Sequence, residues 1–260
     1  MSITLLLSIF FAVFALAIPA HLRAGLIAKR DQPQIINGYN EDEITQLHDA
    51  FDDAMTLART MQTTPAEILD PIFQKYFALS DKATVLQVFE NITGSDQNFD
   101  NGNPLLGHIR IVEDYLEDGD QVCEGDDDWG ELRLWETDYP NMVVCPPAFG
   151  HGGINKGYDG VAAVTCASIG NSMSWRMETL GSFEIHEFTH FEKLVVPPLP
   201  EETSDDYYGI LGARKAGRDG KCLEVADCFM WVAIEVYWTV NCARTFADPA
   251  PDADTDPIGC

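Results

Sequence analysis

The chain has 260 residues, of which 46% are hydrophobic; this is enough to bury a core and excludes a disordered acidic chain. Its formal net charge of −26 excludes nucleic acid and anionic membrane surfaces as partners, because like charges repel. The same charge fits either simple solubility of a secreted protein or attraction of cationic partners. Composition therefore predicts one globular acidic domain and no particular function.

The amino-terminal segment predicts secretion. Residues 1–20, MSITLLLSIFFAVFALAIPA, are uncharged and apolar and end in small residues, as a cleaved signal peptide does. An uncleaved membrane anchor is the alternative, because no Lys or Arg precedes the apolar run. The Lys29-Arg30 pair predicts a processing site that removes residues 21–30 as a short pro-segment. We then expect residues 31–260 to be a single secreted, monomeric domain without a membrane attachment.

Cysteine and asparagine positions fit the same compartment. The seven cysteines predict up to three disulfides with one cysteine left over, in pairings that spacing does not determine. No CxxC pair is present, so a cysteine-ligated structural zinc is not expected. Asn91 begins the sequon Asn-Ile-Thr and is the expected glycosylation site.

Hydrophobic periodicity predicts an α+β domain that is rich in helix. Apolar residues recur at three- and four-residue steps and predict helices over 40–62, 65–77 and 82–92, and again over 178–195 and 224–246. Residues 108–116 and 131–139 alternate like strands, and 142–149 is a further short extended run. We expect these strands to form a small, mainly antiparallel sheet. The tail over residues 247–260 is acidic and rich in proline.

One short motif carries chemistry. In GSFEIHEFTHFEKL, His186 and His190 lie one helical turn apart and therefore project from the same face of the expected helix. Two imidazoles so placed can bind one zinc ion, and Glu187 beside them can act as the general base of a hydrolase. The alternative is a pair of packed histidines on a buried helix, and a third ligand is needed to decide between the two.

The sequence ETSDDYYG, residues 202–209, follows this motif. Here the chain resembles the aspzincins, the deuterolysins and fungal lysine-specific metalloendopeptidases, which pair HExxH with a downstream GTxDxxYG motif. Glu202 stands where that motif has its first glycine. The residues that match it are Thr203, Asp205, Tyr208 and Gly209.

The resemblance implies a zincin-like fold and roles for individual residues. Asp205 would be the third zinc ligand, with its neighbour Asp206 as the alternative. Tyr208 would donate a hydrogen bond to the oxyanion, unless its ring only packs in a turn. Asp227 would line the pocket for a Lys or Arg after the scissile bond, or would instead cap its helix. The resemblance also implies a disulfide between Cys145 and Cys166.

Together these features predict a secreted endopeptidase that binds one Zn²⁺ on His186, His190 and Asp205. Its partner would be a protein or peptide substrate, and a basic one because the chain is acidic. Two alternatives belong to other classes. The first is a secreted zinc-binding surface antigen or zinc scavenger without turnover. The second is an adhesion or effector protein whose degenerate site binds no zinc.

Overall fold

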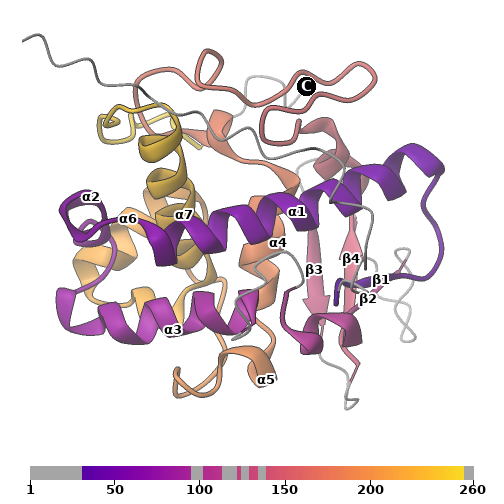
Figure 1. The fold of residues 1–260 in the computed structure, drawn as a ribbon, viewed down its shortest axis with the longest axis horizontal. Coiled ribbons are helices and arrows are strands. Elements are labelled where there is room, and N and C mark those ends of the chain that lie inside the picture. Colours follow the sequence, from indigo (N-terminus) through magenta and orange to yellow (C-terminus); the bar gives the residue numbers. More distant parts are fainter. Residues whose placement is uncertain (1–30, 95–101, 113–121, 124–128, 134–138, 255–260) are drawn as a thin grey trace, which may run out of the picture.

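The computed structural model describes residues 31–94, 102–112, 122–123, 129–133 and 139–254, so the expected signal peptide, processing site and Cys260 lie outside the described residues. Within these ranges the fold is α+β, with seven α-helices and one four-stranded sheet (Figure 1). The helices are α1 (Glu41–Thr63), α2 (Ala66–Phe73), α3 (Lys82–Thr93), α4 (Leu180–Thr189), α5 (Glu192–Val195), α6 (Gly209–Asp219) and α7 (Ala226–Asn241). The strands are β1 (Gln34–Ile35), β2 (Arg110–Val112), β3 (Gly130–Arg133) and β4 (Asn141–Val144).

The three helices expected in the first half of the chain are confirmed. Asn40 caps the start of α1: its side chain accepts from the backbone N–H of Glu43, while the Glu43 carboxylate accepts from the N–H of Asn40. This reciprocal pair satisfies two donors that the first turn of a helix would otherwise leave free. α1 crosses the molecule from the sheet to the helical side, with α3 alongside it (Figure 1).

The sheet differs from the expected mainly antiparallel one. Its strand order is β1-β2-β4-β3, and only the β3–β4 pairing is antiparallel; β1–β2 and β2–β4 are parallel. The alternation of side chains is the same in both kinds of sheet, so the sequence pattern could not give strand direction. β4 lies between β2 and β3, so these two strands, which follow each other in the sequence, are not hydrogen-bonded neighbours. β3 is an edge strand and lies against α4.

The core is built around α7 and α4. Every residue of α7 from Ala226 to Thr239 is buried, as its nearly uniform apolar sequence predicted. All ten residues of α4 are buried as well, and this helix packs against both α1 and α7. Gly181 permits the close approach of α1, because a Cβ there would lie 2.5 Å from the carbonyl oxygen of Ala50. Among the described helices, none combines the length and the apolar character needed to cross a membrane.

Helix α6 was not predicted. Its sequence, GILGARKAGRD, contains three glycines, which favour loops over helices in a sequence pattern. At Gly217 the reason for glycine is packing, since a Cβ would lie 2.7 Å from the carbonyl oxygen of Lys75. The helix ends at Gly220, which adopts the left-handed conformation common after helix C-termini.

The expected Cys145–Cys166 disulfide is wrong. Three disulfides are present in the described residues, and they join Cys123 to Cys145, Cys166 to Cys242 and Cys222 to Cys228. Cys145 follows β4 and lies beside Cys123, with a Cα–Cα distance of 5.4 Å that suits a bridge. Cys166 instead reaches the carboxyl end of α7, 76 residues along the chain. The position of Cys242 is set by the packing of α7, which cysteine spacing does not encode.

The expected glycosylation at Asn91 gains no support from the structure. Asn91 lies on α3, and its side-chain nitrogen donates to the carbonyl oxygens of Leu194 and Pro197 at 2.9 and 3.1 Å. The nitrogen that would carry a glycan is therefore engaged with the segment around α5.

Candidate metal centre

Helix α4 places the two histidines and the glutamate of the motif. Thr179 caps the start of the helix: its hydroxyl accepts from the backbone N–H of Ser182, while Ser182 Oγ accepts from the N–H of Thr179. His186 lies inside the helix, and His190 is the residue that ends it, still with helical backbone angles. Their Nε2 atoms are 3.2 Å apart, so the two rings converge as expected from their spacing.

Asp205 completes a triangle of donor atoms. Its Oδ1 lies 2.9 Å from His186 Nε2 and 3.1 Å from His190 Nε2. Donors held about 2.0–2.1 Å from a tetrahedral ion are about 3.3 Å apart, so the triangle has the size that one such ion needs. The three residues form a group that could hold a metal ion. Asp206, the alternative ligand, instead accepts a hydrogen bond from Ser204 Oγ.

Hydrogen bonds on the far side of each ring leave the Nε2 atoms free to bind. His186 Nδ1 donates to Asp227 Oδ1 at 2.6 Å, and His190 Nδ1 donates to the carbonyl oxygen of Thr203 at 2.9 Å. Both acceptors offer only lone pairs, so Nδ1 carries the hydrogen in each ring. With a metal ion bound in place of a proton, each Nε2 would direct its lone pair at the triangle. Such partners orient histidine ligands in metalloproteins generally.

The loop that carries Asp205 is fixed at the two residues that precede it. Thr203 Oγ1 lies 2.8 Å from Thr189 Oγ1, which ties the loop to the last turn of α4. The next residue, Ser204, donates its backbone N–H to the carbonyl oxygen of Glu224 at 2.7 Å. Thr203 therefore holds the loop against the end of α4 in two ways. Its hydroxyl contacts Thr189, and its carbonyl oxygen accepts from His190.

Asp227 occupies neither of the two expected positions. It is 3% exposed and lies near the start of α7, where one oxygen accepts from His186 and the other accepts from the backbone N–H of Gly209. A carboxylate with these partners does not line an open pocket for a cationic side chain. It does not cap its own helix either, because the backbone group that it accepts from begins α6. Its role in the structure is to orient His186.

The electrostatics of the site favour a positive charge at the triangle. Burial alone would lower the pKa of His186, but hydrogen bonds to Asp205 and Asp227 raise it well above its ordinary value. The pKa of His190 is raised in the same way, with burial opposed by Asp205 and Glu187. Burial opposes ionisation of Asp205 too, but hydrogen bonds to the two rings hold its pKa below the usual range. Three carboxylates around two imidazoles form an environment that a divalent cation would neutralise.

The Glu187 carboxylate lies beside the triangle. Its Oε2 accepts from the backbone N–H of Leu132 on edge strand β3 at 2.6 Å. Its Oε1 lies 4.0 Å from His186 Nε2 and is the oxygen turned toward the metal-binding atoms. Burial raises the pKa of Glu187 to about 7, although the two histidines and the Leu132 N–H act to lower it. A carboxylate of this pKa can both accept and return a proton near neutral pH. The contact with Leu132 was not predictable from the motif.

Tyr208 lies near the carboxylates of the site. It precedes the first residue of α6, and 69% of its surface is exposed. Partial burial and the nearby carboxylates of Asp205, Asp227 and Glu187 raise its pKa to about 12. The phenol therefore keeps its hydrogen and can donate a hydrogen bond to an anion formed in the site. An exposed ring also disfavours the alternative in which Tyr208 only packs in a turn.

No protein-family profile matches the chain, and a search of curated proteins finds no match either. The resemblance to the aspzincins thus rests on the two motifs alone. The donor triangle is a separate observation, because it depends on how α4, the 203–205 loop and α7 pack.

Proposed function

We propose that this protein is a secreted zinc-dependent endopeptidase. The single observation that carries the proposal is the triangle of His186, His190 and Asp205 with the Glu187 carboxylate beside it. Nitrogen and oxygen donors in a three-ligand set, with a fourth position left open, are the usual composition of a catalytic zinc site. A structural zinc site would instead close all four positions with protein ligands.

A zinc ion bound by these residues would supply a Lewis acid that lowers the pKa of water and polarises a carbonyl. The protein's own groups then move the protons. Glu187 Oε1 accepts a proton from the attacking water and returns it to the leaving amine nitrogen, while Oε2 stays anchored to Leu132. Tyr208 donates its phenolic hydrogen to the oxyanion of the tetrahedral intermediate. Asp227 holds His186 in place throughout.

The acidity of the chain supports a cationic peptide as substrate. A net charge of −26 attracts basic chains over distances of about a Debye length and so raises the rate of encounter. Because Asp227 is hydrogen-bonded to His186, a preference for basic peptides would come from the net negative charge of the protein and not from a pocket lined by Asp227. The three disulfides fit an oxidising compartment, as expected for a secreted protein.

Metal analysis combined with a protease assay tests the proposal. The purified protein should contain one zinc per chain, digest casein, lose this activity with a chelator and regain it when zinc is added. Zinc without proteolysis would identify a zinc-binding antigen or scavenger instead. Absence of both would leave a degenerate site on an adhesion or effector protein.

A further inference from the structure

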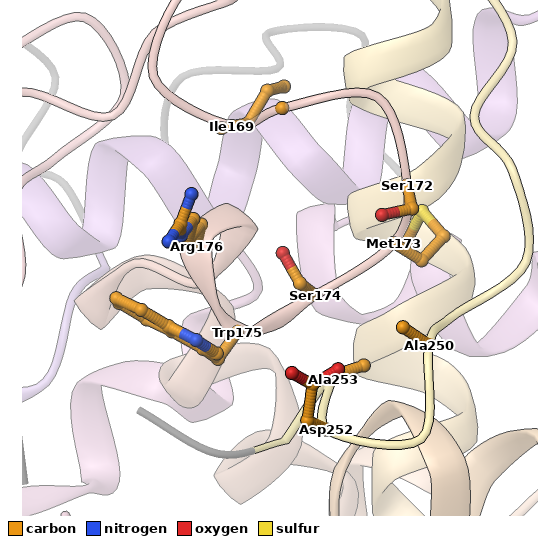
Figure 2. A pocket seen from close by; sticks show the side chains of 10 residues that line it. Ile169, Ser172, Met173, Ser174, Trp175, Arg176, Ala250, Asp252 and Ala253 are labelled. Atoms are coloured by element: carbon orange, nitrogen blue, oxygen red, sulfur yellow. The ribbon is translucent and has the colours of Figure 1, made fainter. Parts of the chain in front are cut away.

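The carboxyl-terminal segment 247–254 is built into the molecule beside the candidate site. The backbone of Ala247 pairs with Ser172, and its carbonyl oxygen accepts from the N–H of Met173 at 3.1 Å. Farther along, Trp175 donates its N–H to the carbonyl oxygen of Ala253 at 3.0 Å. Figure 2 shows Ala250, Asp252 and Ala253 of this segment across from Ser172 and Ser174. These five residues help to line one cavity of about 370 Å³.

This docking places Asp254 at the start of α6. Its two carboxylate oxygens accept from the backbone N–H groups of Ile210 and Leu211, at 2.7 and 3.1 Å. The first N–H groups of a helix have no partner within the helix, and an acidic side chain is a preferred acceptor for them. Tyr208 occupies the capping position of α6, but within the described part of the chain its side chain makes no capping hydrogen bond. Asp254, from 44 residues farther along, supplies the cap instead.

Gly209 lies between Asp254 and the metal site. Its N–H donates to Asp227, the residue that orients His186. On its other side, a Cβ at Gly209 would lie 2.5 Å from the carboxyl carbon of Asp254, and its φ of 71° also favours glycine. The backbone immediately after Tyr208 is thus held between two carboxylates.

We propose that Asp254 is a positioning residue for Tyr208. By capping α6 it fixes the backbone of Tyr208, and the phenol can then donate a hydrogen bond in the site. The inference rests on the proposed function for the role of Tyr208 but not for the contact itself. A small displacement of a donor that acts only in the transition state lowers kcat and leaves KM almost unchanged.

The test combines Asp254→Ala with Tyr208→Phe in a double-mutant cycle on the zinc-loaded protein. We expect Asp254→Ala to lower kcat about tenfold with KM within about twofold, and to have almost no further effect when Tyr208 is already Phe. Asp254→Asn keeps one acceptor oxygen and should retain most of kcat. Asp252→Ala, a charge change in the same segment, is the control and should match the parent. An equal loss of kcat in both backgrounds would mean that Asp254 does not act through Tyr208, and would overturn the inference.

Hydrogen exchange gives a readout that does not depend on catalysis. The amides of Ile210 and Leu211 should exchange faster in Asp254→Ala than in the parent and in Asp252→Ala. Unchanged exchange would overturn the inference whatever the kinetics show. A parent protein that lacks peptidase activity but loses this protection in Asp254→Ala would refute the proposed function while supporting the contact.

Discussion

Replacing Asp227 should weaken metal binding, because this residue orients His186 from behind. Asp227→Asn keeps an oxygen that can accept from His186 Nδ1 but removes the negative charge. Asp227→Ala removes both and also leaves the N–H of Gly209 without its acceptor. Loss of such a partner typically costs about 10- to 100-fold in metal affinity, or about 1.4–2.7 kcal/mol. We expect Asn near the lower end of this range and Ala near the upper end.

Competition with a chromophoric zinc chelator measures the affinity directly, and circular dichroism of the metal-free variants checks that they remain folded. Asp206→Asn is the matched control, because it removes the same charge next to Asp205 from an exposed side chain that contacts Ser204. Its zinc affinity should equal that of the parent.

The reasoning would be refuted if Asp227→Asn bound zinc as tightly as the parent protein. If that variant also lost a preference for Lys or Arg after the scissile bond, Asp227 would line a specificity pocket, as the resemblance implied. A weaker affinity in Asp206→Asn would likewise show that Asp206 takes part in the site.

Further predictions concern stability and covalent structure. Burial raises the pKa of Asp53 from 3.8 to about 7, so the folded state holds a proton that the unfolded chain releases, and stability falls as pH rises through this interval. The free energy of unfolding of Asp53→Asn, measured in urea, should therefore rise relative to that of the parent between pH 4 and pH 7, by at most about 4 kcal/mol. A difference between the two proteins that is the same at pH 4 and at pH 7 would contradict this. Gly209→Ala should lower stability by about 1–3 kcal/mol and weaken the zinc site, because a Cβ would contact the Asp254 carboxyl; a variant with the melting temperature and zinc affinity of the parent would exclude that contact. Unreduced peptide mapping should recover Cys166 linked to Cys242, and recovery of Cys166 linked to Cys145 would contradict the structure.

The parts of the site that the sequence could predict are those determined locally. Helical spacing brings His186 and His190 together, and the motif that follows supplies Asp205 within a few residues of a fixed anchor, Thr203. The helices of the first half were predictable for the same reason, since a periodic apolar stripe needs no knowledge of distant residues.

The parts that could not be predicted depend on contacts between distant segments. The sheet pairs β2 with β4, which are not neighbours in sequence order, and the Cys166–Cys242 disulfide depends on the position of α7. The backbone N–H of Leu132, which anchors Glu187, belongs to a strand 55 residues before it. Asp227 and Asp254 meet the site only because α7 and the carboxyl-terminal segment pack beside α6.

Zinc content and peptidase rate of Glu187→Gln, measured beside the parent, test the central claim most directly. Glu187 is not one of the three donors, so the variant should still bind one zinc per chain with the affinity of the parent. Its amide cannot accept the proton from water, so the peptidase rate should fall by about 10²–10⁴-fold. A variant that digests casein as fast as the parent, or that loses its zinc, would contradict the proposed division between metal ligands and base.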